Sequence, residues 1–169
     1  INLDIDYRHF LSQEIPKGTT CIAHQVVELK DIHEKFPGGF PRTYQLANTM
    51  IHQKFWNKDE CDFDELGEKL GIEAVTVSTI MQPPGNVIPL HRDTFFKIKS
   101  QYPENKRKIV RCNIYLEDWK AGHFLQYEDT VDTHWKQGSG HMWDEEVLHI
   151  GANAGMEDKY TLQISGFLK

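Results

Sequence analysis

The chain has 169 residues, of which 39% are hydrophobic and 11% aromatic, enough for the core of one domain and few for two. Its formal net charge of -6 at pH 7 opposes general binding to a phosphate backbone, so nucleic acid is not an expected partner. No apolar run approaches the length of a membrane span, and the first residues lack the features of a secretion signal. The cysteines, Cys21, Cys61 and Cys112, lack metal-motif spacing and predict ordinary thiols in a reducing compartment. We therefore expect a cytoplasmic protein.

The first part of the chain carries helical signals. Residues 41–56 follow a proline suited to a first helical turn, and their apolar side chains recur near a 3.6-residue spacing, as seen for Tyr44, Leu46, Met50, Ile51 and Phe55. A second helix is predicted over residues 63–70, where Asp62 can cap the first turn and Gly71 ends the last. We therefore expect a helical section over residues 1–72.

From residue 73 onward the pattern changes to short β-prone runs separated by turn residues. The runs cover residues 74–81, 87–91, 108–117, 123–127, 131–135, 141–143, 147–150 and 160–168. Such short strands after a helical section favour a double-sheet jelly roll over an alternating α/β sheet. We expect a single domain over residues 1–169, with a β core over 73–169, helices packed on its outside and a site at the barrel mouth. Loops 94–107 and 126–134 are expected to shape the entrance for substrate.

The stretch over residues 84–93 reads PGNVIPLHRD and ends in His91-x-Asp93. Side chains two residues apart on an extended segment point to the same face, so this imidazole and this carboxylate can reach one ion. A second imidazole from a distant strand would complete a facial triad with open positions, and His149 is the candidate. Taken singly, a surface pair beside a turn and a satisfied core histidine are the more common interpretations. Their joint occurrence favours a metal site.

Two of the predicted strands have one polar face. Arg111, Asn113 and Tyr115 alternate with apolar residues in residues 108–117. The last strand repeats this pattern with Lys159, Thr161, Gln163 and Ser165. Two polar faces pointing inward would be costly in a packed core, but they suit a cavity that receives a dicarboxylate. Arg111 and Lys159 would supply its counter-charges.

The C-terminal third contains Trp135-Lys-Gln-Gly138, Trp143-Asp144-Glu145, His149 and Asn153. This pattern resembles the aspartyl/asparaginyl β-hydroxylase family of Fe(II)- and 2-oxoglutarate-dependent oxygenases. Upstream, Pro84-Gly85-x-x-Ile88-Pro89-x-His91 is similar to the family's approach to its first metal ligand, and Arg111-x-Asn113 occupies the place of an Arg-x-His pair. The resemblance covers residues 78–168.

The resemblance implies a mainly β protein with a double-stranded β-helix, a cupin-like jelly roll. It further implies that His91, Asp93 and His149 hold Fe(II), that 2-oxoglutarate and O2 are co-substrates, and that succinate and CO2 are released. Lys159 would pair with the remote carboxylate of 2-oxoglutarate, and Thr161 would offer a hydroxyl to it. Arg111 and Asn113 would lie at the metal end. The expected substrate is an amino-acid side chain, as peptidyl Asp, Asn or Pro or as a free amino acid.

Two departures from the family pattern bear on this reading. Several members lack the carboxylate ligand, whereas Asp93 is present here, as in free-proline cis-hydroxylases and prolyl hydroxylases. A carboxylate in this ligand position leaves no vacancy for a halide ion, which favours a hydroxylase over a halogenase. The serine that the family has on its first barrel strand falls on Ile80, and Ser78 and Gln82 are the candidates to replace it.

An alternative function stays open, because similar barrels bind metals or small molecules without turnover. A non-catalytic, cupin-like binding barrel is therefore the second hypothesis.

Overall fold

The computed structural model describes residues 1–15 and 52–169. In chain order the described elements are α1 (Tyr7–Leu11), β1 (His52–Phe55), α4 (Phe63–Leu70), β2 (Ile72–Gln82), β3 (Val87–His91), α5 (Phe96–Gln101), β4 (Ile109–Tyr115), β5 (His123–Tyr127), β6 (Thr130–Asp132), β7 (Gly140–Trp143), β8 (His149–Asn153) and β9 (Lys159–Leu168). None of the helices in these two ranges combines the length and the apolar character needed to cross a bilayer.

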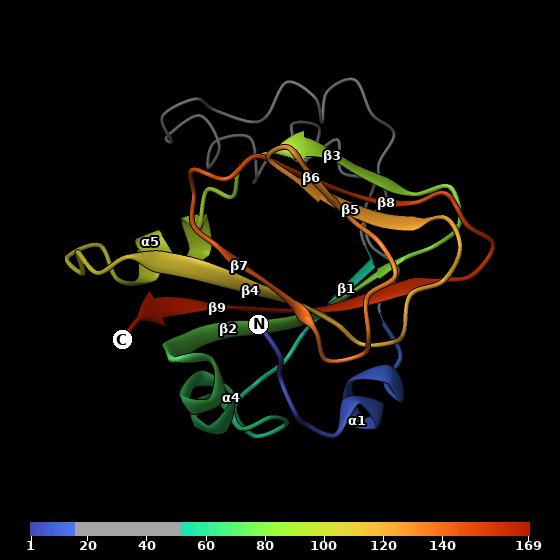
Figure 1. Ribbon diagram of the computed structural model, residues 1–169. Helices are drawn as coiled ribbons and strands as arrows, with labels where there is room; N and C mark the ends of the chain where they lie inside the picture. The colour runs from blue at the N-terminus through green and yellow to red at the C-terminus, as the bar shows by residue number, and fades with distance from the viewer. Residues whose placement is uncertain (16–51) are drawn as a thin grey trace, which may run out of the picture.

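The strands form two antiparallel sheets that face each other, as Figure 1 shows. One sheet has five strands in the order β1-β2-β9-β4-β7, and the other has four in the order β3-β8-β5-β6. Most neighbouring pairs, such as β2–β9, β4–β9 and β3–β8, join strands that are not consecutive in the chain, which is the connectivity of a jelly roll rather than of a meander. The predicted fold class, a double-stranded β-helix, is confirmed.

The helix α4 forms where its local signals predict it. The Asp62 side chain accepts hydrogen bonds from the backbone N–H groups of Asp64 and Glu65, and Gly71 ends the helix at φ 70°. Both ends therefore meet the hydrogen-bonding needs of a helix terminus without help from tertiary contacts.

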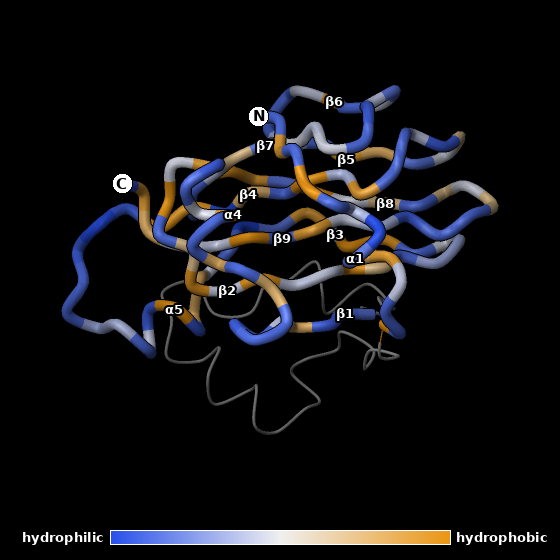
Figure 2. The backbone as a smooth tube through the Cα atoms, turned by 90° about the horizontal axis from the view of Figure 1, so that it is seen from below, coloured by the Kyte–Doolittle hydropathy of each residue, from blue (hydrophilic) through white to orange (hydrophobic). Residues whose placement is uncertain are grey.

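The main hydrophobic cluster lies between the five-stranded sheet and the helices α1 and α4, which cover its outer face (Figure 1). A smaller cluster contains Tyr115, Leu125, Trp135 and Trp143. Hydrophobic and hydrophilic residues alternate along the strands of this sheet (Figure 2), so its two faces differ in character. The core-facing side chains include Val77, Cys112, Leu162 and Ile164, which pack with Leu66 of α4. The expectation of helices on the outside of the barrel is confirmed for α1 and α4. The opposite, polar face of the sheet is left to line the interior between the sheets.

Several predicted elements differ from the structure. Most of the helix expected over 41–56 lies outside the described residues, and its end is wrong because residues 52–55 form β1, paired with β2. The expected loop 94–107 contains α5, which begins after Phe95 in the left-handed conformation at φ 48°. The strand expected over 131–135 ends at Asp132, before His134 turns the chain at φ 60°. The strand expected over 147–150 begins only at His149.

Candidate metal centre and its cavity

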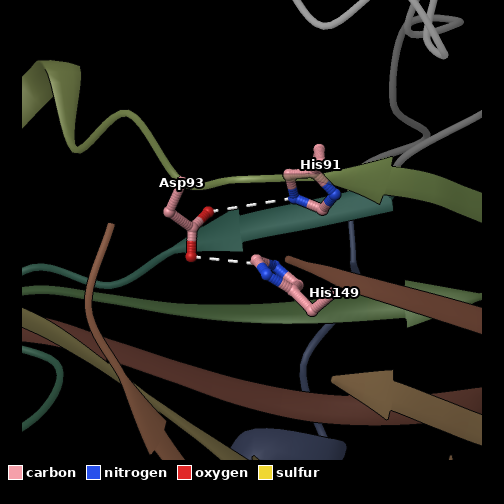
Figure 3. Close-up of side chains that lie close together, drawn as sticks. All are labelled: His91, Asp93 and His149. Atoms are coloured by element: carbon pink, nitrogen blue, oxygen red, sulfur yellow. Dashed lines mark ion pairs between the residues drawn. The ribbon is translucent and has the colours of Figure 1, made fainter. Parts of the chain in front are cut away.

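Three potential metal ligands converge at one end of the smaller sheet. His91 is the last residue of β3, His149 is the first of β8, and the two are register partners. Asp93 lies two residues beyond β3, and one ligand atom from each of the three residues lies within 4.8 Å of the others. Figure 3 shows both imidazoles turned toward the Asp93 carboxylate. The structure thus brings the three predicted residues together, and their binding of a metal stays a prediction.

Backbone carbonyl groups orient both imidazoles. His91 Nδ1 lies 2.8 Å from the carbonyl oxygen of Pro89, and His149 Nδ1 lies 3.1 Å from that of Val147. A carbonyl oxygen only accepts, so each Nδ1 donates and each Nε2 keeps its lone pair. The two Nε2 atoms face different Asp93 oxygens, at 3.9 and 3.8 Å. Such hydrogen bonds from the far side of the ring are typical of histidines that bind a metal.

The Asp93 carboxylate is buried, with 7% of its side chain exposed, and it is held from the other sheet. The Arg111 guanidinium donates to Oδ1 at 2.5 Å, and the Trp143 indole N–H donates to Oδ2 at 2.8 Å. Burial opposes ionisation, but Arg111, the two histidines and the Trp143 hydrogen bond outweigh it, and the pKa of Asp93 is lowered. The carboxylate is therefore charged at neutral pH.

Both histidines are neutral at the same pH. Burial lowers the pKa of His91 to about 4, and burial likewise lowers the pKa of His149. Two neutral imidazole nitrogens and one carboxylate, with further positions open, are the donor set of non-haem Fe(II) oxygenases. The residues present therefore fit Fe(II).

The triad borders a cavity of about 350 Å³ between the two sheets. Its floor is the polar face of the five-stranded sheet, and the predicted residues Ser78, Arg111, Asn113, Lys159 and Thr161 all line it. These five residues therefore face the cavity as the sequence predicts, whereas Tyr115, expected on the same face, is stacked on Trp135 and does not line it.

Lys159 lines the cavity with a buried amino group, 3% exposed. Its ammonium donates to Gln82 Oε1 at 3.3 Å and to the Phe124 carbonyl at 3.0 Å, and lies 5.6 Å from the centre of the Trp135 ring. Within the described residues it makes no ion pair with a carboxylate. Burial lowers its pKa to about 7. An ammonium held by neutral groups at the end of a cavity is a site for an anion.

A glycine leaves space beside this ammonium. Gly151 follows His149 by two residues on β8 and lines the same cavity. A Cβ atom built at Gly151 would lie 3.7 Å from Lys159 Nζ and 3.4 Å from Gln82 Oε1. The missing side chain therefore opens the cavity directly in front of the cation.

Two further contacts involve polar residues that were expected to bind ligands, and their ligand-binding roles stay predictions. Arg111 was expected to meet co-substrate or substrate, but its guanidinium contacts Asp93 and also donates from Nε to Ser165 Oγ at 3.0 Å. Of the two candidates to replace the family serine, Gln82 contacts Lys159, whereas Ser78 accepts a hydrogen bond from Gln53 at 2.9 Å.

Trp143 and Gly151 lie at the site without having been predicted from the sequence to have a role there. Trp143 belongs to the motif that carries the resemblance, but nothing in that motif indicates that its N–H reaches Asp93. Gly151 shares its strand face with His149, and strand alternation alone could have found it.

Comparisons with known proteins support the fold. A scan against protein-family models and a search of curated proteins found no match. Among solved structures, a Pseudomonas putida prolyl-4-hydroxylase is similar over 72% of this chain and 70% of its own, with 18% identity and a TM-score of 0.50. A predicted oxalate decarboxylase from Thermotoga maritima is 15% identical, with a TM-score of 0.46, over 72% of this chain and 84% of its own. A Cupin_2 domain of a transcriptional regulator from Enterobacter cloacae is 9% identical, with a TM-score of 0.44, over 70% of this chain and 98% of its own. At this identity the likeness to the hydroxylase shows a shared fold.

Proposed function

We propose that the protein is a Fe(II)- and 2-oxoglutarate-dependent oxygenase that hydroxylates an amino-acid side chain, in a peptide or in a free amino acid. His91, Asp93 and His149 would hold Fe(II) through two Nε2 atoms and a carboxylate oxygen. Bound iron, with 2-oxoglutarate and O2 as further ligands, would supply the oxidising chemistry, with release of succinate and CO2. The donor set described above supports this assignment.

The observation that supports 2-oxoglutarate most strongly is the buried ammonium of Lys159, in the same cavity as the triad. His149 and Gly151 are two residues apart on one strand, a rise of roughly 7 Å. The backbone positions of the potential ligand His149 and of the glycine beside Lys159 are therefore separated by about the length of a five-carbon dicarboxylate. One carboxylate of 2-oxoglutarate would meet Lys159, and its keto-acid end would lie at the triad.

The remaining residues bind and orient rather than react. Arg111 and Trp143 keep the Asp93 carboxylate ionised and fixed in orientation, and the backbone carbonyls before each histidine fix the ring nitrogens. Thr161, which is 4% exposed, has its hydroxyl on the floor two residues from Lys159, where it would add a hydrogen bond to the bound dicarboxylate. Residues of both sheets line the cavity around the triad and Lys159.

The test is spectroscopic first and catalytic second. Fe(II) and 2-oxoglutarate added under nitrogen should produce a weak visible charge-transfer band, and O2 should then release succinate, more so with a peptide or amino acid that is a substrate. His149→Ala is the control and should give neither signal. A protein that binds metal but forms no band and releases no succinate would instead be a non-catalytic binding barrel.

A further inference from the structure

The cavity opens to solvent at three of its side chains. Of the described residues that line it, Phe55, Arg92 and Lys97 are exposed, and the others are buried or half-buried. Arg92 and Lys97 belong to the segment 91–98, every residue of which lines the cavity, and Phe55 is the last residue of β1. The Lys97 ammonium lies 4.4 Å from the centre of the Phe55 ring, so the two segments meet there. We call these three residues the rim.

The rim is positively charged, on a chain whose formal net charge is -6. The Lys and Arg side chains in residues 1–15 and 52–169 that form no ion pair with a carboxylate are Lys58, Arg92, Lys97, Lys106 and Lys159. Three of them line this one cavity. Among the lining residues that the structure describes, the single carboxylate is that of Asp93, which is paired with Arg111. An opening whose charged groups are all cations attracts anions.

The proposed iron and co-substrate leave the rim without a counter-charge. Lys159 would meet the distal carboxylate of 2-oxoglutarate, and Fe(II) would meet Asp93 and the carboxylate at the other end. Lys159 and Asp93 are buried, whereas Arg92 and Lys97 are exposed, so a ligand held between Lys159 and the triad lies inward of the rim. An anionic group on the substrate that is hydroxylated would supply the missing charge.

The Arg92 guanidinium is held in one orientation by the loop before β8. Its Nε donates to the carbonyl oxygen of Glu146 at 2.8 Å. Its two Nη groups have no hydrogen-bond partner in the part of the chain that the structure describes. A planar guanidinium fixed at Nε presents the remaining N–H groups as a fork that matches a carboxylate. Because Arg92 lies between His91 and Asp93 in the chain, such a carboxylate would be held beside the potential metal ligands.

We propose that the rim binds a carboxylate of the substrate that is hydroxylated, an inference that rests on the proposed oxygenase function. Arg92 would take the carboxylate through its Nη groups, and Lys97, placed by the Phe55 ring, would add a second positive charge. Because both cations are exposed, the contribution of each is modest and falls as salt is added. The carboxylate is either the α-carboxylate of a free amino acid or the side chain of an acidic residue in a peptide.

Two matched pairs of probes distinguish these sources. N-acetyl-L-alanine and N-acetyl-L-alaninamide differ in the α-carboxylate, and N-acetyl-L-aspartate α-methylamide and N-acetyl-L-asparagine methylamide differ in the side-chain carboxylate. Binding is measured by NMR titration under nitrogen, with the protein loaded with Fe(II) and 2-oxoglutarate and with metal-free Lys159→Met, which lacks the inner anion site. The carboxylate member of one pair should bind about fivefold more tightly than its amide, and less so at high salt. Equal affinities within both pairs would overturn the inference.

Variants then locate the carboxylate. Arg92→Gln and Lys97→Gln should each reduce the preference for the carboxylate probe, and the double variant should abolish it. Lys58→Gln is the matched control, because Lys58 is also exposed and unpaired, lies 5.9 Å from the centre of the Phe63 ring and does not line the cavity. It should keep the preference in full. A double variant that still prefers the carboxylate, or an equal loss in Lys58→Gln, would show that the rim is not the binding site.

The two levels of inference fail in different ways. In the double variant the 2-oxoglutarate requirement should stay nearly unchanged, because Lys159 and the triad are intact. A raised requirement with an unaltered carboxylate preference would assign the rim to the entry of 2-oxoglutarate, and would overturn the inference while leaving the oxygenase function standing. Absence of iron and 2-oxoglutarate binding in the unaltered protein would overturn the oxygenase function, and the metal-free titrations would still test the rim.

Discussion

The Arg111 guanidinium contacts the Asp93 carboxylate at 2.5 Å, and this ion pair joins the two sheets. Arg111 belongs to β4 in the five-stranded sheet, whereas Asp93 follows β3 in the other. The potential metal ligand is thus held by a cation of the opposite sheet, and the Arg111 side chain, 22% exposed, has little water to replace this partner. The proposed metal binding and the folding stability would therefore be linked at Asp93.

Asp93→Asn should destabilise the metal-free protein, because it keeps the shape of the side chain but removes the charge that faces Arg111. Loss of one partner of a buried ion pair costs about 3 kcal/mol or more. Urea unfolding of the metal-free variant measures this loss. The free energy of unfolding of His149→Ala, measured in the same way, should fall less because this substitution leaves no charge unpaired. Equal losses in the two variants would contradict a special contribution of the ion pair.

Asp93→Gly should weaken iron binding more than it erases activity, because two oriented imidazoles remain and water can fill the vacant ligand position. Iron titration under nitrogen, followed by an assay of succinate release, separates the two effects. An unchanged dissociation constant for iron would mean that Asp93 is not a ligand.

His91→Ala and His149→Ala should each abolish turnover and iron binding with the fold intact, because a methyl group cannot replace an imidazole ligand. Circular dichroism checks the fold, and iron content checks the site. His134→Ala changes an exposed histidine outside the cavity and should behave like the unaltered protein. Near-normal iron affinity in either cavity variant would show the triad assignment to be wrong.

Lys159→Ala should raise the 2-oxoglutarate requirement by on the order of a hundredfold or more, with iron affinity nearly unchanged. Removing the partner of a shielded charge costs about 3 to 5 kcal/mol, at roughly 1.4 kcal/mol per tenfold. Arg111→Ala should instead weaken iron binding and turnover, because Arg111 holds Asp93. The 2-oxoglutarate dependence of succinate release in both variants decides the matter: the opposite pattern would mean that Arg111 meets the distal carboxylate.

The pKa of Lys159, lowered to about 7 by burial, predicts proton uptake when 2-oxoglutarate binds above pH 7. The free protein then holds a largely neutral amine, and the arriving carboxylate favours the ammonium and raises its pKa. Calorimetry at pH 8 in buffers of different ionisation enthalpy measures the uptake. Lys159→Arg, whose guanidinium stays charged, should bind 2-oxoglutarate without proton uptake. Proton-independent binding by the unaltered protein would contradict this pairing.

The same lowered pKa has a consequence for stability without ligand. Between pH 7 and the ordinary lysine value of 10.5, the unfolded chain binds a proton at Lys159 that the folded protein does not. The contribution of Lys159 to the free energy of unfolding should therefore rise with pH across this window. Comparing unfolding at pH 7 and pH 9 for the unaltered protein and for Lys159→Met isolates this contribution.

Gly151→Ala should fold normally but bind 2-oxoglutarate weakly. The added Cβ meets Gln82 and Lys159 at 3.4 and 3.7 Å, which is ordinary contact, but it takes the space in front of the ammonium. Iron affinity should be unchanged, because the nearest atoms to this Cβ belong to Gln82, Lys159 and Leu125, and none is a potential ligand. A normal 2-oxoglutarate requirement would mean that the distal carboxylate lies elsewhere.

The features that the sequence by itself determined are those with local causes. Asp62 and Gly71 bound α4 because a helix cap acts within one turn, and β3 and β5 begin and end as predicted because alternation and turn residues act over a few positions. The polar faces of β4 and β9 follow from the two-residue period of a strand. The jelly roll follows from many such short strands in succession.

The partners of these residues depended on the tertiary structure. The sequence indicates that Arg111 faces inward, but only the packing of the two sheets brings its guanidinium to Asp93. The extended conformation of residues 52–55 likewise comes from pairing with β2, which overrides their helical spacing. The space over Lys159 arises because β8, which carries Gly151, crosses above β9 in the facing sheet. Such distances between sheets are set by the whole core, and no local sequence pattern contains them.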